Sequence, residues 1–334
     1  MREPAFWWHE ASLAARLLTP FAVVYGAVAA RRLAQAGARV AVPVICVGNP
    51  TLGGTGKTPL VLTLARSLMT SGETPVLLSR GYGGRYAGPL RVDPARHSAA
   101  DVGDEPLLLA RRAPTVVAHD RVAGAQAALA AGASFIVMDD GFQNPSLQKS
   151  FSVLVVDARR GIGNGKVFSA GPLRAPLRAQ LARADALVVV GSASAADGVV
   201  EQARGHGVPV FAASLQPDVA AVAALAGARV LAFAGIGDPA KLFASLAAAG
   251  IAVAGSRGFP DHHRYTRAQA RALCEDADRD GLQLVTTEKD LARMQGDASA
   301  AVLAGRARAF PVKLTLADAP AFLRHLGTRL AVAR

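Results

Sequence analysis

The stretch NPTLGGTGKTPL, Asn49 to Leu60, is the part of this sequence that decides its fold. It follows an apolar run, VPVICVG, and leads into a helix-like segment that starts at Thr58. A phosphate-binding P-loop, G-x-x-x-x-G-K-[ST], occurs in this strand-to-helix context, and Gly56-Lys57-Thr58 supplies its ending. Thr51 stands where the pattern has its first glycine. The glycines that approach a phosphate most closely are kept, so a nucleotide-binding loop is favoured over an ordinary glycine-rich turn.

The residues of this loop have expected partners on a nucleoside triphosphate. Lys57 is expected to reach the β- and γ-phosphates, and Thr58 to place its hydroxyl on Mg²⁺. The backbone N–H groups of the glycines are expected to turn toward phosphate oxygens. The expected nucleotide-binding set is Thr51, Gly53, Gly54, Thr55, Gly56, Lys57 and Thr58.

A second signal is the apolar run SFIVMDDGFQ, in which a strand-like segment ends in two carboxylates, Asp139 and Asp140. A P-loop site needs an acid at such a strand end to hold the magnesium ion, directly or through water. Because adjacent residues on a strand point in opposite directions, we expect one carboxylate to face the metal and the other to cap the next turn. A turn role for both is the alternative.

The rest of the chain repeats this alternation of short apolar runs and helical stretches. The pattern predicts a P-loop NTPase-like α/β domain with a mostly parallel sheet over residues 36–220. A shorter βα series predicts a second, smaller α/β domain over residues 221–334. Ligands of open α/β sheets bind beyond the carboxyl ends of the strands, and most of the motifs follow a predicted strand at that end.

The composition restricts the partners. The chain has 334 residues and a formal charge of +12, from 37 Lys and Arg against 25 Asp and Glu. Such an excess favours nucleic acid, an anionic membrane or a phosphorylated substrate. Aromatic residues are only 5% of the chain, so there are few to stack on single strands, and nucleic acid is disfavoured. The two cysteines, Cys46 and Cys274, form neither a disulfide framework nor a metal cluster.

The amino-terminal segment, residues 1–35, is strongly apolar and is expected to be helical. Its uncharged run from Leu17 to Ala30 is shorter than the roughly 20 residues that span a bilayer. Arg16 and Pro20 interrupt the apolar segment. Two interpretations stay open. The helix lies in a membrane interface with its tryptophans, Trp7 and Trp8, at the headgroups, or it packs on the body of the protein.

Two further segments carry candidate catalytic groups. DVGDEPLLLA places Asp104 before a helix, where it is either a helix cap or a carboxylate that accepts a proton from an attacking hydroxyl. FPDHHRYT places His262 and His263 beside Asp261 in a loop of the second domain. A solvated histidine pair is the alternative, and zinc is disfavoured because no other Cys or His completes a tetrahedral site.

Two glycine-rich loops carry arginines that follow predicted strands. Arg80 lies in SRGYGGRY, and Arg174 lies in GNGKVFSAGPLRAPL. A guanidinium at such a position can bind a phosphate or another charged substrate group, so both are candidate substrate contacts. Solvated surface charge is the alternative for each.

In their order along the chain these motifs resemble the tetraacyldisaccharide 4′-kinase family of Gram-negative bacteria. The resemblance covers nearly the whole chain. It rests on the apolar amino-terminal helix and on GNPTLGGTGKTP, SRGYGG, GDEP, DDGFQ, DARRGIGNGKVFSAGPLR, FAGIGDP, FPDHHRYT and TTEKD. It implies a kinase that uses ATP and Mg²⁺ to phosphorylate the 4′-hydroxyl of a lipid-linked glucosamine disaccharide 1-phosphate in lipid A biosynthesis.

The resemblance also implies roles for residues. Asp104 would take the proton of the sugar hydroxyl, and His262, in the other domain, would orient and tune Asp104. Closure of the cleft would then assemble the site and exclude water. The lipid A precursor and anionic inner-membrane lipids would be partners, with the protein peripheral or monotopic at the cytoplasmic face of the inner membrane.

The chain departs from the family pattern at three positions, where Asn144 replaces a histidine and Ser150 and Ala175 replace acids. A catalytic part for the 144–150 loop is therefore not expected. Two other functions stay open. One is a membrane-associated P-loop ATPase that works as a nucleotide switch, and the other is a soluble small-molecule kinase or ligase.

Overall fold

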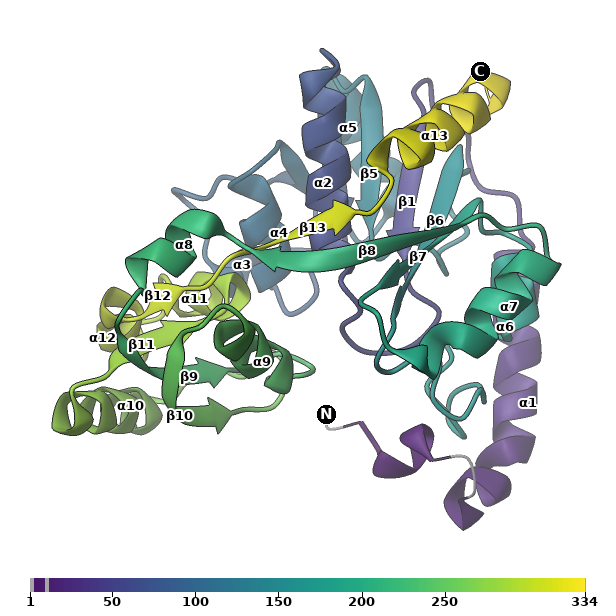
Figure 1. The fold of residues 1–334 in the computed structure, drawn as a ribbon. Helices are drawn as coiled ribbons and strands as arrows, with labels where there is room; N and C mark the ends of the chain where they lie inside the picture. The colour runs from purple at the N-terminus through teal and green to yellow at the C-terminus, as the bar shows by residue number, and fades with distance from the viewer. Residues whose placement is uncertain (1–2, 10–11, 334) are drawn as a thin grey trace.

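The chain folds into two β-sheets flanked by helices, and the structure, a computed structural model, describes residues 3–9 and 12–333 (Figure 1). The larger sheet has nine strands in the order β13-β8-β7-β6-β1-β5-β2-β4-β3, and the smaller has four in the order β10-β9-β11-β12. Both sheets are mostly parallel; β13 pairs antiparallel with β8, and β3 with β4. The predicted mostly parallel α/β fold with a smaller α/β part is confirmed.

The elements have the following bounds. The larger sheet consists of β1 (Val44–Gly48), β2 (Pro75–Ser79), β3 (Leu90–Arg91), β4 (Thr115–Val117), β5 (Phe135–Asp139), β6 (Phe151–Asp157), β7 (Ala186–Val190), β8 (Val210–Pro217) and β13 (Val312–Leu316). The smaller sheet consists of β9 (Arg229–Ala234), β10 (Ala252–Gly258), β11 (Gln283–Thr286) and β12 (Arg308–Ala309). The helices are η1 (Ala5–Trp8), α1 (Leu13–Leu33), α2 (Lys57–Thr70), α3 (Ala99–Val102), α4 (Asp104–Ala110), α5 (Arg121–Ala130), α6 (Leu177–Leu181), η2 (Ser194–Ala196), α7 (Asp197–Gly205), α8 (Val219–Ala224), α9 (Ala240–Ala248), α10 (Arg267–Asp280), α11 (Glu288–Met294), α12 (Ala301–Arg306) and α13 (Ala319–Ala333).

Helices cover both faces of the larger sheet, because successive strand residues point to opposite sides and both sides are apolar. Ile45 of β1 packs on one face with Leu60 of α2 and Phe322 of α13. Its neighbour Cys46 packs on the other face with Ala125 of α5. This double burial explains why the strands read as continuous apolar runs in the sequence.

The central strand β1 positions the nucleotide loop. It lies between β5 and β6 and pairs in parallel with both. The loops that leave the carboxyl ends of β1, β5 and β6 therefore meet at one edge, where α/β proteins bind their ligands. The loop after β1 is the P-loop, the loop after β5 begins at Asp140, and the loop after β6 begins at Ala158.

The observed strand pairing differs from the expected division at residue 221 in one respect. The smaller sheet begins with β9, but β13 and α13 return to the larger sheet, where β13 pairs with β8 and α13 packs in the core beside α2 (Figure 1). Two extended segments, β8 and β13, thus connect the two sheets. Phe310 and Pro311 separate β12 of the smaller sheet from β13 of the larger one.

The amino-terminal helix α1 is one continuous helix of 21 residues, longer than the uncharged run suggested, and it passes through Arg16 and Pro20. It is the one helix in the described part of the chain that is long and apolar enough, by length and composition, to cross a membrane. One narrow side packs on the body, where Gly26 approaches Pro176 closely. The other side is exposed, and its large apolar residues are Leu13, Leu17, Phe21, Val23, Val24, Tyr25 and Val28.

The two tryptophans before α1 do not share one environment. Trp7 is buried, its indole N–H donates to the Ser169 carbonyl at 3.1 Å, and its ring meets Phe168 edge-on. Trp8 lies under the guanidinium of Arg160 at 3.8 Å. The expectation of a tryptophan belt at the membrane is therefore wrong for Trp7, whose ring anchors the segment to the protein. Residues 1–2 and 10–11 of the predicted 1–35 segment lie outside the described residues.

Candidate active site

The P-loop joins β1 to α2, and its backbone needs glycine. Gly56 precedes the first residue of α2 with φ of 98°, a conformation that side chains disfavour. Lys57 follows, and its ammonium donates to Asn49 Oδ1 at 3.1 Å and lies 3.8 Å from Asp140 Oδ1. Thr58 is buried at the start of the helix. Lys57 and Thr58 are thus held together at the carboxyl edge of the sheet.

Thr51, which stands where the P-loop pattern has its first glycine, packs inside the protein. Thr51 is buried, and its carbonyl accepts a hydrogen bond from Arg174 Nε at 2.9 Å. The same guanidinium contacts Asp140, with Nη2 donating to Oδ2 at 3.1 Å. Arg174, a predicted substrate contact, therefore ties the P-loop to the end of β5.

The two carboxylates after β5 have different surroundings. Asp139 is buried, and neither of its carboxylate oxygens has a hydrogen-bond partner among the described residues. Its burial, and then the nearby charge of Glu105, raise its pKa to about 7. Asp140 has φ of 53°. Burial would raise its pKa, but Lys57 and then Arg174 outweigh that effect and lower it.

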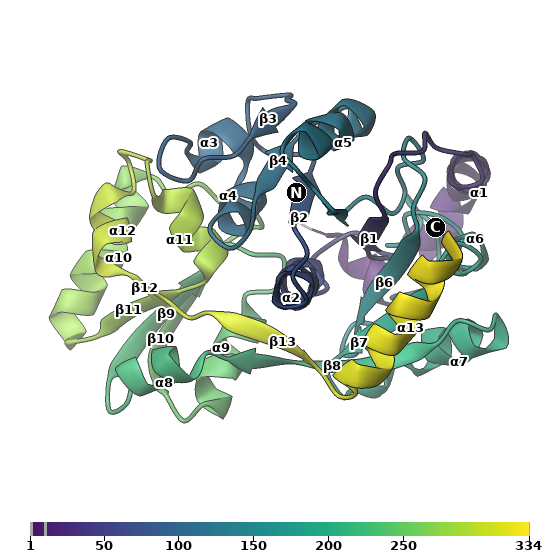
Figure 2. The ribbon, with the colours of Figure 1, turned by 90° about the horizontal axis from the view of Figure 1, so that it is seen from above.

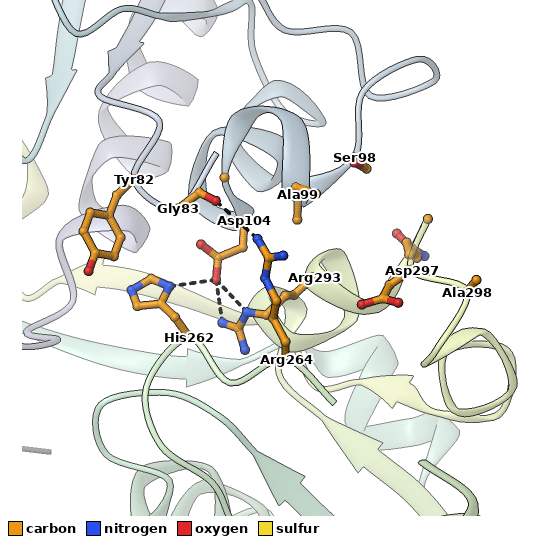
Figure 3. Close-up of a pocket in the computed structure, with 14 residues that line it drawn as sticks. Tyr82, Gly83, Ser98, Ala99, Asp104, His262, Arg264, Arg293, Asp297 and Ala298 are labelled. Atoms are coloured by element: carbon orange, nitrogen blue, oxygen red, sulfur yellow. Dashed lines mark hydrogen bonds and ion pairs between the residues drawn. The ribbon is translucent and has the colours of Figure 1, made fainter. Parts of the chain in front are cut away.

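The structure brings Asp104 and His262 together. Asp104, at the start of α4, is 4% exposed, and its Oδ2 lies 3.1 Å from His262 Nδ1 (Figure 3). The hydrogen bond with Asp104 raises the pKa of His262 against the opposing effect of burial. Burial alone would raise the pKa of Asp104, but His262 and then Arg293 reverse this and hold it well below its usual value. The pair is an ionised carboxylate and an imidazole that favours its charged form.

The glycines of SRGYGG and GDEP explain how this pair is positioned. Gly103 has φ of 92°, and a Cβ there would lie 2.5 Å from the Tyr82 carbonyl. A Cβ on Gly84 would lie 2.6 Å from the Val102 carbonyl carbon. The two loops therefore pack backbone against backbone. This contact places the ring of Tyr82 beside His262, with ring centres 5.2 Å apart.

The smaller domain supplies two cations that sequence reasoning did not single out. Arg293 of α11 forms a buried ion pair with Asp104, and Lys289 of the same helix pairs with Glu105. Lys289 lies in the TTEKD motif, which was the available signal for it, whereas Arg293 lies three residues after the motif. Figure 2 shows α11 beside α4 at the junction of the two domains, and the two helices pack together.

Other predicted residues lie apart from this pair. Arg80 is exposed after β2, and its side chain makes no hydrogen bond or ion pair with the residues that the structure describes. His263 stacks on Phe259 and contacts Gln269, so it belongs to the fold of its loop. The departures have local roles, since Asn144 accepts from the Ser146 N–H, Ser150 from the Val44 N–H, and Ala175 is buried.

A pocket of about 290 Å³ opens onto Asp104 between the two domains (Figure 3). Tyr82, Gly103 and Ser98 line it from the larger domain, and His262 and Arg293 from the smaller. The arrangement can hold a hydroxyl beside a buried carboxylate. It is the geometry required for general-base activation of an alcohol.

A family model described as "Tetraacyldisaccharide-1-P 4'-kinase" matches residues 14–331. The chain belongs to the tetraacyldisaccharide 4′-kinase family. It is 55% identical over 334 residues to the tetraacyldisaccharide 4′-kinase of Nitrobacter winogradskyi, with 100% of this chain and 99% of the relative covered. It is 57% identical over 334 residues to that of Rhodopseudomonas palustris strain BisA53, with 100% and 97% covered. The family resemblance expected from the motifs is confirmed.

Among solved structures, the chain is similar to an "apo" form of LpxK from Aquifex aeolicus in complex with ATP. The TM-score is 0.71 at 25% sequence identity, and 95% of this chain and 100% of the other are covered. The tetraacyldisaccharide 4′-kinase fold thus extends over both domains and the amino-terminal helix.

Proposed function

We propose that this chain transfers the γ-phosphoryl group of ATP to the 4′-hydroxyl of a lipid-linked glucosamine disaccharide 1-phosphate. The observation that carries the proposal is the contact between Asp104 and His262 in a protein of this kinase family that also has a P-loop. A nucleotide switch has no need of a buried carboxylate that faces a pocket and is held by the second domain. That alternative is not favoured.

The proposed reaction couples transfer of the γ-phosphoryl group to transfer of the acceptor proton. Asp104 accepts the proton of the sugar 4′-hydroxyl, and the oxygen forms a bond to the γ-phosphorus as the bond to the bridging oxygen of ADP breaks. ADP leaves, and Asp104 returns its proton to solvent. His262 holds the carboxylate in place, and Lys57 offsets negative charge on the phosphates, as positioning and electrostatics dominate phosphoryl transfer.

The residues present fit a magnesium ion. The carboxylate oxygens of buried Asp139, which have no hydrogen-bond partner among the described residues, and the hydroxyl of buried Thr58 are the kind of oxygen donor that Mg²⁺ prefers. No group of three or more His, Cys, Asp or Glu that could hold a metal is found in residues 3–9 and 12–333. Mg²⁺ usually keeps several waters and binds through one or two carboxylates and substrate phosphates. Mg²⁺ would neutralise phosphate charge there, with Thr58 and Asp139 as its holders and Asp140 beside them.

The remaining assignments are also proposed. Arg174, which is paired with Asp140, and Arg80 would contact the anionic substrate. The exposed apolar side of α1 would lie against the cytoplasmic face of the inner membrane, where anionic lipids attract the surplus positive charge.

The test is a phosphoryl-transfer assay with labelled ATP, Mg²⁺ and a disaccharide 1-phosphate lipid in mixed micelles. A doubly phosphorylated lipid is the expected product, and Lys57→Ala is expected to abolish it. Lipid-independent ATP hydrolysis with no labelled lipid would support the nucleotide switch. Full activity without lipid or detergent after deletion of residues 1–35 would favour a soluble small-molecule kinase.

A further inference from the structure

The two oxygens of the Asp104 carboxylate are not equivalent. Oδ2 accepts three hydrogen bonds from side chains of the smaller domain: from His262 Nδ1 at 3.1 Å, and from Arg293 Nε at 3.1 Å and Nη2 at 2.5 Å (Figure 3). Among the residues that the structure describes, Oδ1 accepts only the Glu105 backbone N–H, at 2.9 Å. A carboxylate oxygen has about two lone-pair sites. Oδ2 is therefore saturated, and Oδ1 retains a site for a further proton.

Arg293 is held rigidly on the far side. Its Nη1 donates to Asp290 Oδ1 at 2.8 Å, and Asp290 is fully buried. Asp290 is itself fixed by the hydroxyls of Tyr265 and Thr287, at 3.0 and 2.6 Å. The guanidinium is thus anchored by α11 before it reaches Asp104, and little freedom is left to its planar fork.

The same guanidinium also holds the loop that carries His262. Nη1 donates to the carbonyls of Gly235 and His263, each at 3.2 Å. His262 in turn donates its backbone N–H to the Gly235 carbonyl at 3.0 Å. One side chain therefore fixes the distance between the carboxylate and its imidazole partner.

We propose that Arg293 is a positioning residue for phosphoryl transfer: it fixes Oδ2 of Asp104 from the second domain, so that Oδ1 faces the acceptor hydroxyl. The proposal rests on the proposed kinase function. Pairing with a guanidinium weakens a carboxylate as a base. In a loose transition state, however, the placement of the nucleophile matters more than the strength of its base. The arrangement favours orientation over basicity.

Several other charged groups face this carboxylate or its partners. His262 contacts it directly, and Asp261 lies 3.8 Å from the far nitrogen of that ring. Lys289 acts on it from α11 while paired with Glu105 of α4. Removal of Arg293 leaves His262 and Lys289 as the cations near Asp104. The pKa of Asp104 is then expected to rise toward its ordinary value without a change in the identity of the base.

The experiment compares Arg293→Gln and Arg293→Lys with the wild type, by kcat, KM and the pH profile of lipid phosphorylation. Arg293→Gln is expected to lower kcat roughly 100-fold, since small displacements of a reacting group cost this much, with KM for ATP within about twofold. The acidic limb of the pH–rate profile of Arg293→Gln is expected to move to higher pH, because the pKa of Asp104 rises. Arg293→Lys is expected to keep the limb near its wild-type position and to regain part of kcat.

The matched control is Arg112→Gln. Arg112 pairs with Glu288 at 3.1 Å across the same α4–α11 junction but outside the pocket, and it is expected to leave kcat and the pH profile unchanged. Wild-type kcat in Arg293→Lys or in Arg293→Gln would overturn the proposal. Equal losses in both variants with an unmoved acidic limb would also overturn it, because they indicate a purely structural role.

A readout without turnover separates this inference from the proposed function. The imidazole of His262 is followed by NMR titration in the full chain, in the wild type and in Arg293→Gln. Loss of the Arg293 guanidinium is expected to raise the pKa of the His262 imidazole, so that it titrates at higher pH. An unmoved titration would count against the Arg293 contact. A wild type that makes no labelled lipid would instead count against the proposed function.

Discussion

Lys241 of the smaller domain forms an ion pair with Asp157 at the end of β6, and its ammonium also lies 3.4 Å from the Gly54 carbonyl of the P-loop. A Cβ on Gly237 would lie 3.5 Å from the Gly54 nitrogen, so the FAGIGDP turn rests on the nucleotide loop as well. This second link between the domains is separate from the one through Asp104. The smaller domain therefore contacts the P-loop and the catalytic carboxylate at the same time.

Loss of this ion pair is expected to destabilise the protein. Lys241→Met would leave the buried Asp157 carboxylate with the Arg159 N–H as its one partner among the described residues, at a cost of about 1–3 kcal/mol. The control is Lys313→Met, whose pair with Asp218 is 52% exposed on the lysine side and is expected to contribute little to stability, because solvent screens it. Thermal melting compares them. Equal losses for the two variants would contradict a special role for Lys241.

Asp104 and His262 are expected to act as one unit in catalysis. Each single variant, Asp104→Asn or His262→Gln, should lower kcat by roughly 100-fold or more, the usual contribution of general-base catalysis. Because removal of either partner disables the pair, kcat of the double variant should be only slightly below that of the less active single variant. Steady-state phosphorylation of the lipid acceptor measures all three. Losses that multiply would show that the two residues act independently.

The pH dependence of stability follows from the raised pKa of His262. A folded-state pKa above the unfolded value adds stability that is fully present below the unfolded pKa, near 6.5, and is lost as the pH rises through the folded value. The melting temperature of the wild type should therefore exceed that of His262→Gln most below about pH 6.5. The difference should shrink at higher pH. A difference that grows toward alkaline pH would contradict the ion pair with Asp104.

Local sequence patterns predicted the elements that carry the nucleotide loop. GGTGKT and the two aspartates of DDGFQ are short signals within one strand–loop–helix unit, so the positions of Lys57, Thr58 and Asp139 followed from the chain alone. Strand ends on a parallel sheet then had to converge. The buried strands were equally legible, because both faces of the sheet are covered.

Contacts between distant segments were less accessible. Arg293 and Asp104 are 189 residues apart, and no periodicity in TTEKD indicates that the residue three places after its aspartate enters the site. The return of β13 to the larger sheet likewise depends on pairing with β8, which a single strand pattern does not specify. The sequence left Trp7 between a membrane interface and the body of the protein, because the partner that decides this, Ser169, is remote in the chain.

The magnesium site can be tested through binding. Asp139→Asn removes the buried carboxylate with two unpartnered oxygens and is expected to abolish the extra thermal stabilisation that Mg²⁺ gives at a fixed ATP concentration. Asp101→Asn is the control, since that carboxylate caps α3 and pairs with Arg85 away from the P-loop. It should lower the melting temperature but retain the Mg²⁺ response. A full Mg²⁺ response in Asp139→Asn would remove Asp139 from the site.

The exposed side of α1 is expected to bind anionic membranes. Leu17 and Phe21 are 68% and 69% exposed, one turn apart on the same side of the helix, while Ala15 and Ala22 face the protein. Burial of each large side chain in lipid contributes about 1.5–3 kcal/mol. The double variant Leu17→Glu, Phe21→Glu should therefore bind phosphatidylglycerol-containing vesicles at least about tenfold more weakly in flotation assays. Binding by the wild type should also weaken with salt, since headgroup attraction is screened.

The control for the membrane prediction is Val219→Glu, which adds one negative charge, half that of the α1 double variant, at an apolar position that is 82% exposed on α8, beside the smaller sheet. This residue is remote from α1 along the chain and is expected to leave vesicle binding unchanged. If Val219→Glu lowers binding as much as the α1 variant does, general charge governs association. If the α1 variant binds like the wild type at low salt, the exposed apolar side does not contact lipid. If the exposed apolar side of α1 contacts lipid, only the α1 variant should lose vesicle binding.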